Sequence, residues 1–538
     1  MQTDLARPNI VLILVDDMGF SDLGCYGSEI ETPHLDRLAT GGLRFSQFYN
    51  CARCCPTRAS LLTGLYPHQA GVGQMVGNLG HPSYQGYLNH RCVTIAELLR
   101  TAGYRTFMSG KWHVGSDYPP HRPDAWTRHA GDATHPLPIQ RGFDAHYGTL
   151  GGAGSFFEPP ALIHNDRFIL PEALPEDYYL TDALGAHGAQ MIASGDTTKP
   201  FFLYCAHTAP HWPLHAPEAT IAKYRGRYLG GWDRLREARY ESLLASSLLD
   251  SRWPLSPRDP AAPPWEEAAH REWQDHRMAV YAAQIEHMDR AVGRVIAQVE
   301  SLGQMDNTLF LFLSDNGGCA EFLREDGELN SWPGHFAVPL RNGERTVVGN
   351  IPDKPPGAAD TFMSYDLPWS NVSNAPFRRH KCWTHEGGIS TPLIAHWPAG
   401  IPEPGLRHQP GHVVDIMATC LEAAGASYPK THDGRDITPL EGESLLPAFS
   451  GQPWSRQRPI FFEHQGSAAI RDRDWKLVRA TTSFGPNRAH GPWELYNMAD
   501  DRTELTDLAG AHPPEAERLL KQYDNWCQHA GVVDFLTL

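Results

Sequence analysis

Polar side chains that could bind a metal ion stand directly after two apolar runs of the sequence. Asp16 and Asp17 follow the run "IVLILV", and Asp315 and Asn316 follow the run "TLFLFLS". Three carboxylates and one carboxamide form an oxygen-only ligand set, which suits a hard cation such as Ca²⁺ or Mg²⁺ better than zinc. A single Asp after a strand is more often a turn residue or a helix cap, so the prediction depends on the four residues together.

Basic side chains follow two further apolar runs. Lys111 and His113 lie in "GKWHVG", and His207 and His211 lie in "HTAPHWP". Alone, each of them would be interpreted as an ordinary loop residue. Together with the acids, they indicate one polar site that is assembled from the ends of four strands.

The stretch "NCARCCPTRASLLTG", residues 50 to 64, crowds three cysteines into five positions. Cys51 and Cys54 have the spacing of a zinc knuckle or of a redox pair. A zinc site would need a second ligand pair, and no other C-x-x-C occurs in the chain. A redox pair would accompany a thioredoxin-like unit, which the sequence pattern does not indicate.

A nucleophile at the start of a helix fits this stretch better. Pro56 suits the first turn of a helix, and Gly64 suits its end. Cys54 would then lie at the helix N-terminus, where free N–H groups and the helix dipole favour an anion. Arg58, one turn further on, could pair with the same anion. The pattern therefore favours Cys54 as a nucleophile that faces an oxyanion.

Short apolar runs alternate with amphipathic stretches over most of the chain, which predicts an α/β fold with a large mixed, mostly parallel sheet flanked by helices. Ligands bind beyond the carboxyl ends of the strands in such a sheet, so the polar residues above would meet at one edge. Helices are expected over residues 275–302 and 413–426. The predicted strands are Ile10–Val15, Arg105–Ser109, Phe201–Ala206, Thr308–Leu313 and Leu393–Trp397.

The character of the sequence changes after about Trp454. The stretch "PIFFEHQGSAAIRDRDWKLVRA" indicates short antiparallel strands, and a closing helix is expected over about residues 514–529. We therefore predict a catalytic α/β domain over residues 1–454 and a small C-terminal α+β domain with an antiparallel sheet over 455–538. Three segments, 116–140, 226–267 and 317–380, resist regular assignment and are predicted to form functional rims.

Composition limits the classes of partner. The formal net charge of −16 argues against nucleic acid and against anionic membrane surfaces. No run is long enough to cross a membrane, and the N-terminal apolar run is too short for a signal peptide. Ten cysteines in 538 residues are too few for a disulfide scaffold. We therefore expect a cytoplasmic protein whose cysteines are mostly reduced.

Several motifs resemble one known family. "CCPTRASLLTG" matches the C-x-P-x-R signature of the type I, formylglycine-dependent sulfatases, and "GKWHVG" resembles their second signature. The blocks "NIVLILVDDMGFSDLGCYG", "APHWPLHAP", "LSDNGG" and "EGGISTPLIAHWP" follow in family order. The chain is thus similar to this branch of the alkaline phosphatase superfamily, and most similar to bacterial arylsulfatases. Arg53 departs from the pattern, since a small or aliphatic residue usually precedes the cysteine, and His207 and His385 replace less polar or smaller residues.

The resemblance implies roles for individual residues. Cys54 would be oxidised to Cα-formylglycine by a formylglycine-generating enzyme that acts on the nascent chain. Cys51 and Cys55 would have no chemical role. One Ca²⁺ would be held by Asp16, Asp17, Asp315 and Asn316, and the sulfate pocket would be lined by Arg58, Lys111, His113, His211 and Lys381.

The reaction that the resemblance implies is hydrolysis of a small-molecule aryl, or also alkyl, sulfate monoester to the phenol or alcohol and inorganic sulfate. One hydroxyl of the hydrated aldehyde would attack sulfur and form a covalent sulfate intermediate. Deprotonation of the second hydroxyl, by His113, would expel sulfate. His211 and Lys381 would act on the leaving-group side.

Two alternative functions compete with this one. A phosphonate or phosphate ester hydrolase of the same superfamily could share the formylglycine. Asn316 favours a sulfatase, because the phosphonate hydrolases of similar pattern tend to have histidine there. A non-catalytic anion-binding protein would leave the full set of metal ligands and basic residues without a purpose.

Overall fold

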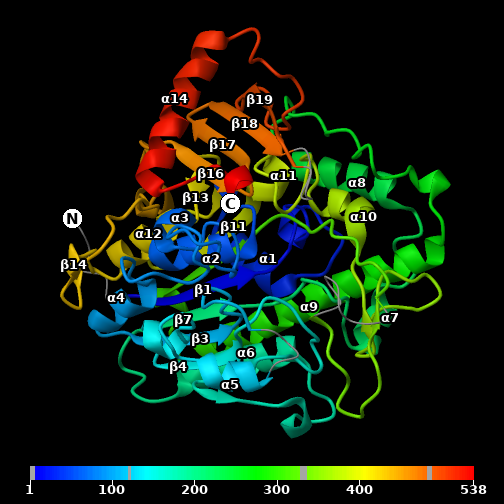
Figure 1. The fold of residues 1–538 in the computed structure, drawn as a ribbon, viewed down its shortest axis with the longest axis vertical. Helices are drawn as coiled ribbons and strands as arrows, with labels where there is room; N and C mark the ends of the chain where they lie inside the picture. The colour runs from blue at the N-terminus through cyan, green and yellow to red at the C-terminus, as the bar shows by residue number, and fades with distance from the viewer. Residues whose placement is uncertain (1–6, 119–122, 327–335, 482–487) are drawn as a thin grey trace.

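The computed structural model describes residues 7–118, 123–326, 336–481 and 488–538. Over these residues the centre of the molecule is one eleven-stranded mixed sheet (Figure 1). In spatial order its strands are β12 (Gly405–Arg407), β2 (Leu43–Tyr49), β11 (Ser390–His396), β8 (Thr308–Ser314), β1 (Asn9–Val15), β7 (Phe201–Ala206), β3 (Arg105–Gly110), β4 (Ala145–Thr149), β5 (Leu162–His164) and β6 (Arg167–Phe168), with β13 (Gly411–His412) beside β2.

Most neighbouring strands in this sheet are parallel. The run β8, β1, β7, β3 and β4 is parallel throughout, whereas β11 is antiparallel to both β2 and β8. The predicted mixed, mostly parallel sheet is therefore confirmed. All five predicted strands are present, although β11 begins three residues before the predicted Leu393. Strand β2 was not predicted, because Arg44, Ser46 and Gln47 interrupt its apolar run.

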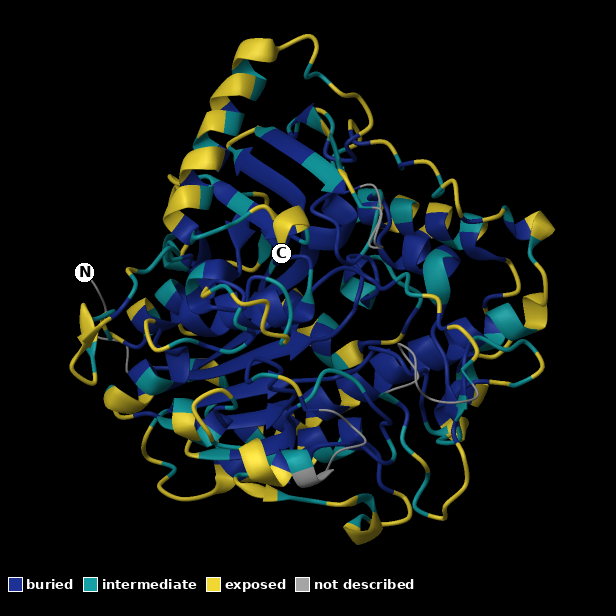
Figure 2. Ribbon diagram, in the orientation of Figure 1, coloured by how far each residue is buried: buried dark blue, intermediate teal, exposed yellow. Residues whose placement is uncertain are grey.

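Both faces of the sheet are covered by helices. In β1 the residues Val11, Ile13 and Val15 belong to one hydrophobic core, and the alternate residues belong to another. Every residue of β1 is buried, which explains its unbroken apolar sequence (Figure 2). The first core contains residues of α6 (Leu180–Ala193) and α9 (Arg271–Ser301), and the second contains residues of α2 (Cys54–Thr63), α4 (Ile95–Thr101) and α12 (Asp415–Ala423).

The prediction of an irregular segment over 226–267 was wrong in part, because α8 (Trp232–Ala245) lies within it. Two arginines on the buried side of α8 conceal its helical pattern. Arg236 donates to the carbonyl oxygens of Asn371 and Ser256, and Arg239 pairs with Asp22 and Glu29. Short helices also occur in the other two segments, α5 (Pro123–His129) and α10 (Asp366–Ser373). Residues 119–122 and 327–335 of those segments lie outside the described part of the chain.

A second, antiparallel sheet lies near the C-terminus, as predicted. It contains β16 (Ile460–His464), β17 (Ser467–Asp472), β18 (Trp475–Thr481) and β19 (His490–Asn497), and α14 (Pro513–Ala530) packs on one face (Figure 1). Buried ion pairs join this region to α11 (Glu386–Ile389), the short helix that leads into β11: Glu386 accepts from Lys476 at 2.9 Å and from Arg502 at 3.1 Å. The exact division of the chain at residue 454 stays a prediction.

All ten cysteines are free thiols, and none of them pairs in a disulfide. Within the described residues, the helices include none with the length and apolar character that a membrane span requires.

Candidate active site

The four predicted metal ligands lie together at one edge of the large sheet. Strands β1 and β8 are parallel neighbours in a register that pairs Val15 with Ser314, so the residues that follow them also become neighbours. Asn316 Nδ2 donates to Asp17 Oδ1 at 2.7 Å, and the backbone N–H of Asp17 donates to Asp315 Oδ1 at 3.4 Å. The sheet register therefore assembles this group from positions about 300 residues apart in sequence.

The donor atoms of this group fit a hard cation. Asp16 Oδ1 and Asn316 Oδ1 are buried and have no hydrogen-bond partner among the residues that the structure describes. Burial raises the pKa of Asp315 well above its usual range, and the nearby Asp16 carboxylate raises it further. Unpaired oxygens and crowded carboxylates are costly in a buried site unless a cation binds them. Asp16, Asp17, Asp315 and Asn316 could therefore hold Ca²⁺ through oxygen ligands only.

Two predicted basic residues, Lys111 and Arg58, contact the carboxylates of Asp16 and Asp315. Lys111 follows β3, and its Nζ donates to Asp16 Oδ2 at 2.5 Å. Arg58 lies on α2, and its Nη2 donates to Asp315 Oδ2 at 2.7 Å and to Asp16 Oδ2 at 3.3 Å. Arg58 Nη1 also donates to the carbonyl oxygen of Lys111 at 2.9 Å. These side chains are fully buried, so their charges act in a medium of low dielectric constant.

Two further predicted residues, Lys381 and His211, contact Asp17. Lys381 Nζ donates to Asp17 Oδ2 at 2.8 Å, and His211 Nε2 lies 3.4 Å from the same oxygen. The Nζ of Lys381 and the Nε2 of His211 are 3.4 Å apart. Burial lowers the pKa of His211, and the Asp17 carboxylate opposes that shift.

Cys54 is the first residue of α2, and Arg53 before it has the extended backbone of an N-cap position. Its Sγ, the Sγ of Cys55 and a ring nitrogen of His113 all lie within 4.8 Å of one another. A hydrogen bond from the Cys55 thiol holds the pKa of Cys54 well below its usual range despite burial, and Lys111 lowers it further. Burial lowers the pKa of His113 to about 4, so its ring is neutral and able to accept a proton.

The structure thus brings together all ten residues that the sequence predicted for the site. It also shows one contributor that the sequence analysis missed. Glu321 accepts from Arg53 Nη1 at 3.0 Å and from Trp212 Nε1 at 2.6 Å, and it lies 3.5 Å from Lys381 Nζ. Glu321 lies in a segment without regular periodicity, so no sequence pattern pointed to it.

The three residues that depart from the family pattern have different surroundings. Arg53 joins the site through Glu321. His207 is buried, and neither of its ring nitrogens has a partner in the described ranges. His385 pairs with Glu494 of the C-terminal sheet at 3.4 Å.

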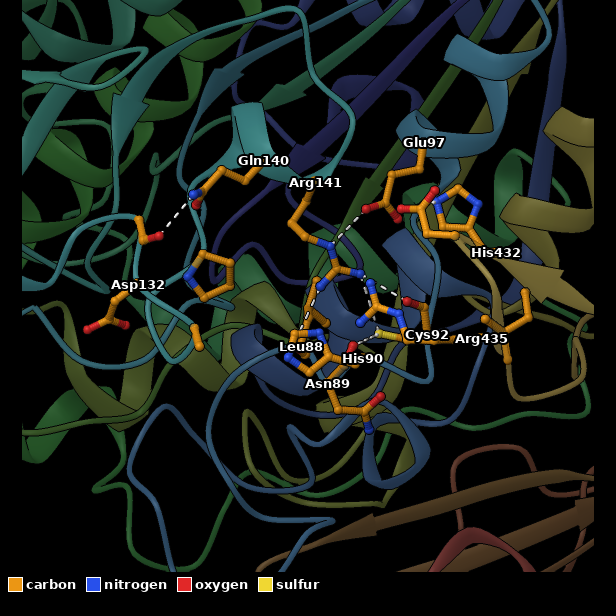
Figure 3. Close-up of a pocket in the computed structure, with 15 residues that line it drawn as sticks. Leu88, Asn89, His90, Cys92, Glu97, Asp132, Gln140, Arg141, His432 and Arg435 are labelled. Atoms are coloured by element: carbon orange, nitrogen blue, oxygen red, sulfur yellow. Dashed lines mark hydrogen bonds and ion pairs between the residues drawn. The ribbon is translucent and has the colours of Figure 1, made fainter.

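A cleft of about 250 Å³ lies elsewhere, between the start of α4, the 131–141 segment and the β14–β15 hairpin (β14 Thr431–His432, β15 Arg435–Asp436) (Figure 3). Arg141 lies at its centre, where Nε donates to Glu97 Oε1 at 3.0 Å and Nη2 donates to the Cys92 carbonyl oxygen at 3.0 Å. None of the lining residues belongs to the group around Cys54. We therefore assign no chemistry to this cleft.

The fold and this site define a hydrolase of the alkaline phosphatase-like class. The sulfatase family model matches residues 8–426, and the chain belongs to the sulfatase family. It is 32% identical to an uncharacterised sulfatase of Schizosaccharomyces pombe over 99% of this chain and 95% of that protein. It is also 32% identical to the arylsulfatase of Klebsiella aerogenes over 82% of this chain and 91% of that protein.

Solved structures share the fold at lower identity. A protein crystallised with its substrate D-glucosamine-2-N,6-O-disulfate superposes with a TM-score of 0.62 at 20% identity, over 98% of this chain and 99% of that one. The phosphonate monoester hydrolase of Agrobacterium radiobacter superposes with a TM-score of 0.58 at 18% identity, over 97% and 96%. Family membership makes the chain a sulfate ester hydrolase, while the shared fold alone does not separate sulfate from phosphonate esters.

Proposed function

We propose that this protein hydrolyses aryl sulfate monoesters, that Cys54 is its Cα-formylglycine precursor and that Ca²⁺ is its metal. The observation that carries the proposal is the position of Cys54. It lies at the N-terminus of a buried helix, with His113 beside it and with Arg58 linking the same helix to the carboxylates of the metal site.

The basic residues explain why an anionic ester would bind here. A sulfate monoester carries a full negative charge that repels a nucleophile. Arg58, Lys111 and Lys381 hold three buried positive charges close to the carboxylates, so they can share those charges with an incoming sulfate group. Bound Ca²⁺ would supply Lewis-acid polarisation of a sulfate oxygen. The oxygens that would hold it are those of Asp16, Asp17, Asp315 and Asn316.

The surroundings of Cys54 suit the modified residue. Hydrated formylglycine carries two geminal hydroxyl groups, one for attack on sulfur and one whose deprotonation releases sulfate. In the modified residue the hydroxyl oxygens would be bonded to Cβ, where Cys54 carries its Sγ. His113 is neutral and within reach of that position, so it can accept a proton from a hydroxyl group carried there.

His211 and Lys381 are proposed to act on the departing oxygen. Both contact Asp17, whereas Lys111 and Arg58 contact Asp16. A protonated nitrogen of either residue can donate to the ester oxygen as its bond to sulfur breaks. Arg58 and Lys111 would bind the sulfate group itself.

Mass spectrometry of the peptide around Cys54 tests the proposal directly. Protein from a host with a formylglycine-generating enzyme should contain an aldehyde or its hydrate at position 54, and Cys54→Ala should abolish turnover of 4-nitrophenyl sulfate. Cys51→Ala is the matched control, because burial raises the pKa of Cys51 to about 12 and leaves this thiol inert. An active enzyme with only unmodified thiol at Cys54 would refute the proposed nucleophile.

The second candidate is a phosphonate or phosphate ester hydrolase, and the fold shared with a phosphonate monoester hydrolase is the observation in its favour. Steady-state rates on an aryl sulfate and on the matching aryl phosphonate separate the two functions. We expect the larger kcat/KM on the sulfate. A larger value on the phosphonate would reverse the assignment.

A further inference from the structure

Glu321 is a largely buried carboxylate next to the residues proposed to act on the departing oxygen. It lies in the irregular segment after β8, and its side chain is only 18% exposed. The Ser364 hydroxyl donates to its carbonyl oxygen at 2.5 Å, and Leu323, two residues further on, is fully buried. The backbone that carries the carboxylate is therefore anchored, although it has no regular secondary structure.

The two oxygens of Glu321 have different partners. Oε1 accepts from Arg53 Nη1 at 3.0 Å. Oε2 accepts from Trp212 Nε1 at 2.6 Å and from Cys319 Sγ at 3.2 Å, and it lies 3.5 Å from Lys381 Nζ. Burial raises the pKa of Glu321, but the charges of Lys381 and Arg53 outweigh burial and hold this pKa well below its usual range. Glu321 is therefore an anion that links Lys381 to the N-cap residue of α2.

Two carboxylates set the position of the Lys381 ammonium group. Nζ donates to Asp17 Oδ2 at 2.8 Å, and Glu321 is the one other acid that pairs with it among the residues that the structure describes. The backbone N–H of Lys381 also donates to the Gly318 carbonyl oxygen at 3.2 Å, so the segment after β8 contacts both ends of this lysine. Lysine has a long and flexible stem. Without Glu321, Asp17 would be the one acid left to position Nζ, and Asp17 is a proposed metal ligand.

Trp212 connects Glu321 to His211. Its indole N–H donates to the carboxylate, and its carbonyl oxygen accepts from His211 Nδ1 at 2.6 Å. Because Nδ1 is the donor in this bond, Nε2 is the nitrogen that faces Lys381 Nζ, at 3.4 Å. Glu321 thus contacts Lys381 directly and reaches His211 through one intervening residue.

We propose that Glu321 is a positioning residue, which holds the Lys381 ammonium group where it can donate to the departing oxygen of the ester. This inference rests on the proposed function and deepens it. Glu321 itself neither contacts the substrate nor transfers a proton, and it acts through Lys381. A donor must lie within hydrogen-bond reach of its acceptor, so displacement of Nζ should cost most when the leaving group is poor.

The test is a double-mutant cycle measured on two esters, phenyl sulfate with the poorer leaving group and 4-nitrophenyl sulfate with the better one. Glu321→Ala should lower kcat/KM about ten- to 100-fold for phenyl sulfate and less than about threefold for 4-nitrophenyl sulfate. In a Lys381→Ala enzyme the same substitution should change the ratio of the two kcat/KM values less than about twofold, because the group that Glu321 positions is then absent.

The matched control is Glu97→Ala. Glu97 is 11% exposed and pairs with Arg141 at 3.0 Å, so it resembles Glu321 in burial and in its partner, but it lies on α4 and outside the site. It should leave the ratio of the two kcat/KM values unchanged. If Glu321→Ala does not fold, Glu321→Gln repeats the cycle, since it keeps the size of the side chain and loses its charge. It should change the ratio in the same direction.

Three results would overturn the inference. Equal losses on both esters would indicate a structural role, and an unchanged ratio in both Glu321 variants would show that Glu321 has no influence on the leaving group. A selective loss that persists in the Lys381→Ala enzyme would mean that Glu321 acts through another group. Failure of the proposed function is distinct, because the parent would then hydrolyse neither ester and carry no aldehyde at Cys54.

Discussion

Arg58 donates two hydrogen bonds to the same oxygen of Asp315, from Nη2 at 2.7 Å and from Nε at 3.1 Å. The pair is completely buried, and it joins the helix that begins with Cys54 to the end of β8. A third bond from Nη1 to the carbonyl oxygen of Lys111 extends the link to the residues after β3. One side chain thus fixes the proposed nucleophile, metal ligand and sulfate-binding residues relative to one another.

Arg58→Lys should test this link. An ammonium group cannot make these bonds in the same fixed geometry, so we expect kcat/KM for 4-nitrophenyl sulfate to fall about 100-fold or more. Arg37→Lys, at an exposed arginine that pairs with Glu300, should leave kcat/KM unchanged. If Arg58→Lys keeps nearly full activity at normal thermal stability, Arg58 contributes charge alone and its fork geometry is irrelevant.

The proposed metal site predicts that one substitution removes both the metal and the activity. Asp315→Ala should remove both calcium and activity, because it removes one of four oxygen donors and leaves Arg58 without its main partner. Elemental analysis of the purified protein should find about one calcium per chain, and Asp196→Ala, at an exposed position, should keep it. Zinc in place of calcium would favour the soft donors Cys54, Cys55 and His113, which also lie within 4.8 Å of one another.

The proposed roles of His211 and Lys381 predict how kcat/KM depends on the pKa of the leaving group. A general acid matters most for a poor leaving group and typically contributes about 100- to 10,000-fold. His211→Ala and Lys381→Ala should therefore slow aryl sulfates of high leaving-group pKa far more than activated nitrophenyl esters. The measurement is kcat/KM over a series of aryl sulfates with graded leaving-group pKa. If kcat/KM depends on leaving-group pKa as steeply in the parent as in both variants, then both residues only bind the sulfate group.

Buried histidines predict how stability depends on pH. Burial lowers the pKa of His215 to about 4 from its ordinary 6.5, and its Nε2 donates to the Thr361 carbonyl oxygen at 2.5 Å. Between these two pH values the unfolded chain binds more protons than the folded one. The free energy of unfolding should therefore be highest above pH 6.5 and fall toward pH 4, by at most about 1.4 kcal/mol per pH unit for each such histidine.

His215→Gln should make that dependence shallower by up to one proton, whatever it does to stability at neutral pH. Denaturant unfolding at several pH values between 4 and 7 measures the slope. His529→Gln, at an exposed position, should leave the slope unchanged. An unchanged slope in His215→Gln would mean that His215 titrates normally in the folded protein.

The meeting of most of the site residues could be predicted from the sequence, because the signals that place them are local. The runs before Asp16, His211 and Asp315 are strands buried along their whole length, so their sequences are almost entirely apolar and easy to recognise. The helix that begins at Cys54 carries its own signals in Pro56 and Gly64. Parallel strands bring their carboxyl ends to one edge, so the meeting of these residues followed from the fold class.

The contributions that the sequence did not reveal come from segments without such periodicity. Glu321 follows an irregular path from β8, and only the folded chain brings it to Arg53 and Lys381. Helix α8 was hidden because its buried arginines are satisfied by partners distant in sequence. Phe462 of β16 lies more than 400 residues from Cys54 along the chain. It packs in one hydrophobic cluster with Tyr49 and Ala52, a contact that depends on how two sheets pack and that no local pattern records.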